Sequence, residues 1–355
     1  MALLKPFRAV RYDAERAGPL TDLVAPPYDV ISPEEREAYL GRSPYNVVHL
    51  TLPDSESEAA RLWGEWNAAG VLVREPEPSV WTLSQDYVGP DGVPRTRTGL
   101  LASLRAEPYS SGAVLPHERT HRGPKEERLR LLRAVRVQLE PIFLLHDGPS
   151  PALPERQPDL EAGGARLWRT GGEALAAVAG RPLLIADGHH RYETALAFHL
   201  EDGSDGSAYL PVVLVSTTDS GLTIFPTHRI AREAELPEAT LNGDLESLLR
   251  QLAAEPHGAA AAVVYTARGA GLLRGRAGEL DSELVERLAP GELSYTPSED
   301  EARTAVDSGR AAAAFLLRPP RIEDVFAVAA AGRTMPQKST YFYPKLLSGL
   351  LFHPL

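Results

Sequence analysis

Residues 181–200 read RPLLIADGHHRYETALAFHL, and this stretch decides how the surrounding chain folds. Its first part, 181–186, is a short apolar run, which is typical of a buried strand. Asp187 and Gly188 are residue types that favour a tight turn. Over 189–200 apolar side chains recur three and four residues apart, which predicts an amphipathic helix. The sequence therefore predicts a strand, a turn and a helix in direct succession.

This turn is the strongest candidate binding site in the sequence. The first turn of a helix has unpaired backbone N–H groups and a partial positive charge, so it attracts anions. Gly188 lets a ligand approach the backbone closely. His189, His190 and Arg191 add side-chain donors at the same helix end. We therefore expect these four residues to bind phosphate.

Asp187 has several open roles at this turn: it could cap the helix, hold a hydroxyl group or bind Mg²⁺. The alternative for the whole segment is a capped helix with surface histidines. Binding is favoured because consecutive cationic side chains at a helix N-terminus gain nothing from the helix dipole and repel one another.

The composition is that of a globular protein. The chain has 355 residues, of which 43% are hydrophobic and 24% charged, so it can build more than one core. No apolar run approaches the roughly 18 residues that span a bilayer. The start, MALLKPFRAV, lacks the layout of a signal peptide. We expect a cytoplasmic protein without a membrane partner, and its oligomeric state stays open.

The cysteine count and the charge exclude several kinds of site. With no Cys, the chain has no disulfide, thiolate nucleophile or Cys-ligated metal. A net charge of −11 argues against nucleic acid as a partner. From His117 to Arg136, however, seven Arg or Lys stand against three Glu. This basic island is either an anion site or a solvated helix face.

The order of predicted elements indicates a mixed α/β, or α+β, protein in three regions: an N-terminal α/β region over 1–105, a core over 106–235 and a C-terminal α+β lobe with an apolar tail over 236–355. We expect helices at 33–40, 56–69, 125–137, 189–200, 240–254, 282–288, 299–307 and 321–331. We expect strands at 79–88, 95–104, 141–146, 181–186, 211–216, 221–226, 260–267, 271–277 and 311–317. Hairpins should join the first two strands and the pair at 211–226, and 147–164 should be a loop.

Residues 117–121 read HERTH, which matches the H-E-x-x-H pattern of zinc proteases. Zinc binding by this pattern needs both His on one continuous helix, but Pro116 precedes the segment and Gly123-Pro124 follows it. We therefore expect no zinc site. A turn that aims His117 and Glu118 into a catalytic site is favoured, with Glu118 as general base, and an exposed charged loop is the alternative.

Two further segments offer candidate substrate contacts. In VAPPYDVIS (24–32) a rigid Pro-Pro lead-in positions Tyr28 and Asp29, although a plain turn explains the pattern nearly as well. The segment at 336–341 offers phosphate or carboxylate contacts without the Gly-rich loop of a Walker site, namely Lys338, Ser339 and Thr340.

Four motifs together identify a family resemblance. VAPPYDVIS, PHERTHRGPKEER, LLIADGHHRYETAL and MPQKSTYFYPKLLSGL follow in this order over nearly the whole chain. They resemble the bacterial and archaeal family catalogued as domain of unknown function 1015. That family name carries no established activity.

A more distant resemblance covers about residues 113–200. A His-Glu pair, a helix, the strand PIFLLH and the strand–DGHHR–helix segment are similar in order to the free serine kinases of the ParB/sulfiredoxin-type fold. This resemblance implies a ParB/sulfiredoxin-like core, Glu118 as base, and Gly188 to Arg191 as contacts to nucleotide phosphates. The sequence departs from that pattern by an insert at roughly 147–180.

The leading functional hypothesis is a phosphotransferase acting on a small hydroxy-amino acid, free serine or O-phosphoserine, with ADP or ATP and Mg²⁺. Such a reaction needs positioning and charge neutralisation more than covalent chemistry. The first alternative is a non-enzymatic ParB-like protein that binds a nucleotide, with or without DNA. The second is a phosphoserine phosphatase-like hydrolase, in which water replaces the nucleotide as acceptor.

Overall fold

The structure is a computed structural model that describes residues 2–118, 120, 122–234, 236, 241–256 and 258–355. It divides into two compact units. The larger unit comprises Met1–Pro116, Thr120–Leu222 and Pro344–Leu355, and the smaller unit comprises His117–Arg119 and Thr223–Tyr343. Helices and strands are mixed in both, which confirms the expected α+β class. The expected regions 1–105 and 106–235 therefore share one unit as far as Leu222.

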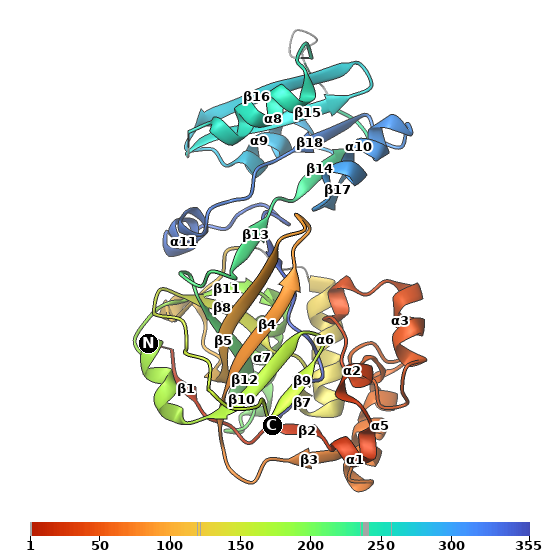
Figure 1. Ribbon diagram of the computed structural model, residues 1–355, viewed down its shortest axis with the longest axis vertical. Coiled ribbons are helices and arrows are strands. Elements are labelled where there is room, and N and C mark those ends of the chain that lie inside the picture. Colours follow the sequence, from red (N-terminus) through yellow and green to blue (C-terminus); the bar gives the residue numbers. More distant parts are fainter. Residues whose placement is uncertain (1, 119, 121, 235, 237–240, 257) are drawn as a thin grey trace. The chain divides into compact units, whose positions relative to one another are not determined.

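A nine-stranded mixed sheet forms the centre of the larger unit (Figure 1). Its strands are β1 (Leu4–Lys5), β4 (Val80–Val88), β5 (Pro94–Arg105), β6 (Val114–Leu115), β8 (Ile142–His146), β9 (Leu160–Ala162), β10 (Ala165–Thr170), β11 (Leu183–Asp187) and β12 (Tyr209–Ser216). The order is β6-β11-β8-β12-β5-β4-β10-β9, with β1 on β5. The pairs β6·β11 and β8·β12 are parallel, and the others are antiparallel.

Helices and short strand pairs surround this sheet. The helical segments of the larger unit are α1 (Ala14–Ala17), α2 (Leu20–Leu23), η1 (Tyr28–Val30), α3 (Pro33–Leu40), α4 (Val48–Thr51), α5 (Glu56–Ala68), η2 (Tyr109–Ser111), α6 (Arg122–Val135), η3 (Gly172–Ala177) and α7 (His189–Asp202). The strand pairs are β2 (Val10–Tyr12) with β3 (Leu72–Arg74) and β7 (Val137–Gln138) with β20 (His353–Pro354). No described helix combines the length and the hydropathy that crossing a membrane requires.

Both faces of the central strands are buried, which is why these strands read as apolar runs rather than as alternating patterns. On one face Tyr192 and Ala195 of α7 join a core with Leu144 and Ile185. On the other face the C-terminal tail lies against the sheet, and a small cavity there is lined by Leu101 and Val213 of the sheet and by Leu346, Leu347, Leu350 and Leu351 of the tail. The apolar tail is therefore part of the larger unit's core.

The smaller unit is built on an antiparallel five-stranded sheet, with the order β16-β15-β18-β14-β17. Its strands are β14 (His228–Ala231), β15 (Ala259–Thr266), β16 (Gly269–Ala277), β17 (Leu293–Thr296) and β18 (Ala313–Leu316), and a separate pair is β13 (Thr223–Phe225) with β19 (Tyr341–Tyr343). Its helices are α8 (Leu245–Ala254), α9 (Asp281–Leu288), α10 (Glu299–Asp307) and α11 (Ile322–Ala330). Side chains of α9 pack on one face of β15, and those of α8 and α10 pack on the other.

The expected hairpin between 211–216 and 221–226 is wrong. β12 pairs with β5 and β8 on its two edges, so neither edge is open to a hairpin partner. β13 pairs instead with β19 in the smaller unit. The turn after β12 is fixed by the side chain of Asp219, whose carboxylate accepts hydrogen bonds from the Thr98 N–H and hydroxyl groups.

The expected loop over 147–164 is partly wrong, because it contains β9. β9 and β10 form a hairpin that ends at Gly163 and Gly164, whose φ angles are 56° and 79°. Two successive residues with positive φ are what a tight hairpin turn requires, so the glycines explain the turn. The insert at 147–180 thus supplies β10, the edge strand β9 of the large sheet, and η3.

Replacing Gly99 with Ala should destabilise the larger unit. Gly99 lies on β5, and an added Cβ would lie 2.8 Å from the Leu214 carbonyl oxygen and 3.0 Å from a Val215 methyl group. Overpacking of a buried sheet typically costs about 1–3 kcal/mol of the free energy of unfolding, which urea titration measures. Gly64→Ala is the control, since its Cβ meets nothing within 4 Å in the middle of α5. That change should stabilise by roughly 0.5–1 kcal/mol, and a Gly99→Ala protein as stable as wild type would contradict the packing described here.

Candidate functional site

The segment at 183–202 folds as its sequence predicts. β11 is buried over Leu183 to Ala186 and ends at Asp187, and α7 begins at His189. Gly188 is the N-cap residue of α7, with φ 96°, a left-handed conformation that an L side chain rarely adopts. The cap position makes no side-chain hydrogen bond, so the expected capping role of Asp187 is not realised.

Asp187 instead joins an ion cluster with Arg191 and Lys345, which we call the Asp187 cluster. Its Oδ2 accepts a hydrogen bond of 2.7 Å from Arg191 Nη2, and its Oδ1 is bound by Lys345 Nζ. Arg191 Nη1 donates to the Pro141 carbonyl oxygen at 2.6 Å. The side chains of Asp187, Arg191 and Lys345 are only 13%, 11% and 17% exposed. Two buried cations therefore share one buried carboxylate.

The charges of this cluster determine its ionisation. Burial alone would raise the pKa of Asp187, but the charges of Lys345 and Arg191, with a further effect of His189, lower that pKa well below its usual range. Burial alone would lower the pKa of Lys345, but Asp187 raises that pKa above its ordinary value. Both groups are therefore ionised across the physiological pH range.

Arg191 is already engaged in this arrangement, although it was expected to contact phosphate. Two of its guanidinium nitrogens donate within the protein, and its Nε lies 3.2 Å from the position that a Cβ on Gly188 would occupy. The positive charge therefore lies directly beside the turn. His189 is buried and His190 is half-buried at the start of the helix. The N-terminus of α7 therefore has no side-chain cap and has a guanidinium charge next to it.

Tyr28 and Asp29 also belong to this region of the larger unit. The Tyr28 backbone N–H donates to Glu140 Oε1 at 3.1 Å, and the Arg128 guanidinium lies 4.2 Å from the centre of the Tyr28 ring. Burial raises the pKa of Tyr28 to about 12, against the opposing charge of Arg191. The charge of Asp29 acts on Arg191 and on Lys345. The structure thus brings Tyr28 and Asp29 near the Asp187 cluster.

Sequence reasoning missed two charged residues of this region. Lys345 binds Asp187, and Glu140 accepts hydrogen bonds from Tyr28 and from the Ser348 hydroxyl at 2.8 Å. Each is a lone charge in an apolar stretch, in YPKLLSGLL and QLEPIFLL. Because an unpaired buried charge is costly, a charge in such a stretch signals a buried partner. The sequence does not say which partner.

The remaining predicted site residues lie together in the smaller unit. His117 Nε2 is 2.9 Å from Thr340 Oγ1, and the Lys338 backbone N–H donates to Glu118 Oε1 at 3.3 Å. The Ser339 hydroxyl donates to the Pro336 carbonyl at 2.6 Å. We call the residues His117, Glu118, Lys338, Ser339 and Thr340 the Glu118 cluster. The sequence predicted one site, and the structure groups its residues into two clusters, one in each unit.

The described residues form no cluster that suits a metal ion. α6 begins at Arg122, so His117 and Glu118 precede the helix that a zinc-protease motif requires, and His121 lies outside the described residues. Among the residues that the structure describes, no group of three or more His, Cys, Asp or Glu could hold a metal ion. Both carboxylate oxygens of Asp187 already bind cationic side chains, so Asp187 does not fit as a ligand of Mg²⁺.

The basic island on α6 is an ion-paired helix surface. Its cations meet carboxylates of α7 and α5, in the pairs Lys125–Glu193, Arg130–Glu56, Arg133–Glu201 and Arg136–Asp202. Each pair has an N–O distance of 2.8 or 2.9 Å. These cations join helices, and the solvated helix face expected as an alternative describes them better than an anion site does.

Comparison with known proteins gives one family match. The model of the family described as "Protein of unknown function (DUF1015)" matches residues 4–289. No curated protein matches the chain.

Several solved structures are similar at low identity. One is a free serine kinase in complex with AMP (16% identity, 67% of this chain, 89% of that chain, TM-score 0.38). A second is a conserved hypothetical protein from Pyrococcus furiosus (16% identity, 67% of this chain, 92% of that chain, TM-score 0.35). A third is SbnI with a C-terminal truncation from Staphylococcus aureus (15% identity, 70% of this chain, 85% of that chain, TM-score 0.40). The expected similarity to free serine kinases is therefore found.

Replacing Asp187 with Asn should strongly destabilise the protein, because Arg191 and Lys345 would remain buried without a carboxylate. Removing one partner of a buried ion pair typically costs about 3–5 kcal/mol. The measurement is the free energy of unfolding at pH 7 from urea titration. Asp91→Asn, which breaks an exposed pair with Arg95 in the β4–β5 turn, should leave that energy nearly unchanged.

Comparing wild type with Asp187→Asn also tests how the free energy of unfolding depends on pH. Since the folded pKa of Asp187 is lowered, its contribution is complete above the unfolded value near 3.9 and is lost as the pH falls toward the folded pKa. Wild type should therefore lose stability below about pH 4 more steeply than Asp187→Asn. Parallel acid profiles for the two proteins would remove Asp187 from this account.

Proposed function

The chain belongs to the DUF1015 family, a protein family of unknown function, and within that family we propose that it is a phosphotransferase. Its substrates are a nucleotide, ADP or ATP, and a small hydroxy-amino acid, with free serine or O-phosphoserine first. The choice of nucleotide and amino acid follows the order of motifs that resembles the free serine kinases. The phosphate-binding element is the N-terminus of α7, residues Gly188 to Arg191.

One observation carries the proposal: the first turn of α7 has no side-chain cap and follows a left-handed glycine. Most helices satisfy part of this end with a Ser, Thr, Asp or Asn cap, and here the Asp187 carboxylate turns toward Arg191 and Lys345. The first-turn N–H groups and the positive end of the helix dipole point toward whatever lies before the turn. Phosphate is attracted by both.

The side chains beside the turn include donors suited to phosphate. The Arg191 guanidinium lies next to the glycine, and the charges of Glu140, Asp187 and Asp29 also act on it. His189 and His190 add imidazole donors at the first two positions of the helix. Because Gly188 has no side chain, phosphate oxygens can approach the backbone closely.

The role of Glu118 in the proposal follows the motif resemblance, and the other contacts follow from the local sequence. Glu118, with His117 beside it, takes the proton of the substrate hydroxyl as general base. Contacts to the amino acid are assigned to Tyr28, Asp29, Lys338, Ser339 and Thr340. No step is assigned to Mg²⁺, since the Asp187 oxygens are already bound by cations.

Replacing Gly188 with Ala should remove nucleotide binding, because the Cβ would lie 3.2 Å from the Arg191 guanidinium and on the face that phosphate approaches. The measurement is the rise in melting temperature on adding ADP or ATP; a ligand at a hundredfold excess over its Kd stabilises by about 2.7 kcal/mol. Gly203→Ala is the matched control. It lies at the other end of α7 with φ 70°, so it carries a similar backbone strain, and its Cβ meets nothing within 4 Å.

The result for this pair decides the position of the phosphate site. Gly203→Ala should keep the nucleotide response of wild type, and Gly188→Ala should lose it. Equal responses in the two variants would place the nucleotide elsewhere and end the proposal for α7.

Glu118→Gln should abolish phosphoryl transfer while sparing nucleotide binding. The amide keeps an oxygen that can accept the Lys338 N–H but no longer takes a proton, so transfer should fall by roughly 10²–10⁴. O-phosphoserine formed from serine and nucleotide is measured by mass spectrometry, with the exposed Glu246→Gln as control. Unchanged turnover removes Glu118 from the mechanism. Release of phosphate from O-phosphoserine without any nucleotide product would identify a hydrolase instead.

A further inference from the structure

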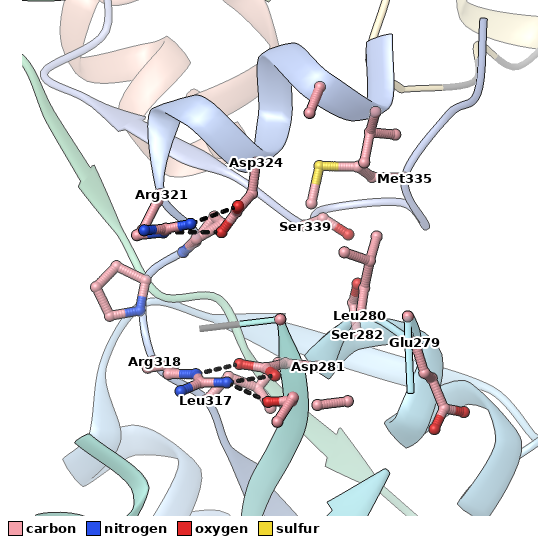
Figure 2. Close-up of a pocket in the computed structure, with 18 of the residues that line it drawn as sticks. Glu279, Leu280, Asp281, Ser282, Leu317, Arg318, Arg321, Asp324, Met335 and Ser339 are labelled. Carbon is pink, nitrogen blue, oxygen red and sulfur yellow. Dashed lines mark hydrogen bonds and ion pairs between the residues drawn. The ribbon is translucent and has the colours of Figure 1, made fainter. Parts of the chain in front are cut away.

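The smaller unit contains a cavity of about 230 Å³ that plays no part in the proposed phosphate site (Figure 2). Its walls come from the starts of β14, β15 and α9, the segment after β18, and α11. Apolar side chains form much of the lining, among them Leu280, Leu317, Val328 and Met335. The volume lies below the range of about 300–1,000 Å³ typical of drug-sized ligands, so the cavity suits a small molecule.

Two ion pairs line the cavity, Arg318 with Asp281 and Arg321 with Asp324. Arg318 Nε donates to Asp281 Oδ2 at 2.9 Å, and Arg321 binds Asp324 through two hydrogen bonds of 2.8 and 3.0 Å (Figure 2). These side chains neutralise each other, so neither pair requires a charged ligand. A different charged residue of the lining, Arg229, has no such partner among the described residues.

Arg229 lines the same cavity and is only 1% exposed. Its Nη1 donates to the Thr227 carbonyl at 3.0 Å and its Nη2 donates to the Gln337 carbonyl at 3.4 Å. Its Nε has no hydrogen-bond partner, and no carboxylate lies within ion-pair distance of it among the residues that the structure describes. A buried guanidinium without a carboxylate is costly, so this charge calls for a counter-ion.

Thr227 also lines the cavity, and it carries a second unsatisfied polar atom. Thr227 is 7% exposed, and within the described part of the chain its buried Oγ1 has no hydrogen-bond partner. A buried polar atom without a partner costs about 1–3 kcal/mol, and native structures explain such atoms by a ligand, an ion or a water molecule. The two unsatisfied groups are an N–H donor on β14 and a hydroxyl on the residue directly before β14.

We propose that this cavity binds a small carboxylic acid, whose carboxylate pairs with Arg229 and accepts a hydrogen bond from Thr227, two residues that line the cavity. A carboxylate matches two donors and supplies the single negative charge that Arg229 lacks. Phosphate fits less well, because the charges of Asp281, Glu286 and Glu118 already act on Arg229 and oppose a second negative charge. The apolar lining accommodates the rest of a short aliphatic or hydroxy acid. This site is independent of the phosphate site on α7.

The test uses the full chain and three sodium salts as probes: propionate, L-lactate and glycolate. Propionamide is the neutral counterpart of propionate, and orthophosphate is the competing anion class. Binding is followed by the ¹H–¹⁵N resonances of arginine Nε–H groups and by calorimetry, at constant ionic strength. We expect at least one acid to shift the Arg229 resonance, assigned by its absence in Arg229→Gln, and propionamide to leave it in place.

Variants of Thr227 isolate the hydroxyl. Thr227→Ser keeps the donor and should bind as wild type, whereas Thr227→Val keeps the shape and should bind at least about tenfold more weakly, as expected for a lost hydrogen bond to a charged group. Arg229→Gln should abolish binding. Arg303→Gln is the control, because it removes a half-exposed guanidinium of the same unit that pairs with Glu299. If Arg229→Gln does not fold, the Thr227 pair decides alone.

Several results would overturn the assignment. They are the absence of any response to the three acids, an equal response to propionamide, tighter binding of orthophosphate than of any acid, an unweakened Thr227→Val, or a loss in Arg303→Gln equal to that in Arg229→Gln. The nucleotide response of the Thr227 variants is recorded in parallel. A failure at this cavity leaves that response intact, so the two proposals fail separately.

Discussion

The carboxylate of Asp187, bound on one side by Arg191 and on the other by Lys345, is the interaction on which the α7 turn depends. It ties the end of β11 to the first turn of α7 and to a tail residue 158 positions later. Arg191 extends the tie to the Pro141 carbonyl before β8. Burial alone would favour a neutral Asp187, so each member of the cluster stays charged because of the others. The carboxylate that could have capped α7 is used in this way, and the helix N-terminus is left to Gly188.

Much of the fold follows from local patterns, and the exceptions follow from pairing between distant strands. The strand–turn–helix at 183–202, the β4–β5 hairpin and most elements of the smaller unit lie where their sequence periodicity predicts them. The predicted hairpin at 211–226 is wrong because β12 already pairs with β5 on one edge and with β8 on the other. Such pairing between distant strands does not show in the local sequence. β9 was missed because Pro, Gly and Asp dominate its surroundings, although Gly163-Gly164 carried the hairpin signal.

The candidate site was predictable in its residue types but not in its grouping. A motif read along the chain gives neighbours within a turn, such as Gly188 and Arg191, and these are indeed adjacent in space. It does not give partners such as Lys345 for Asp187, or Thr340 for His117, which are separated by 158 and 223 positions. Those partners assign the predicted residues to two clusters. They also show that Arg191 contributes to the fold through its ion pair with Asp187, in addition to any contact with a ligand.

Arg191 and Arg229 show that a sequence motif does not reveal whether a charged side chain lacks a partner within the protein. Arg191 lies in the most conspicuous motif of the chain, and its charge is already balanced by Asp187. Arg229 is the last residue of an unremarkable Thr-His-Arg tripeptide, yet within the described residues it is buried without an ion pair, and Thr227 has an unsatisfied hydroxyl. Since burial penalises charge whatever the sequence around it, the uncompensated group is the one that requires a partner from outside the chain. At α7 the feature that attracts a ligand is the positive end of a helix, and in the smaller unit it is two buried side chains without hydrogen-bond partners among the described residues. Both proposed sites therefore arise from polar groups that the fold buries or orients.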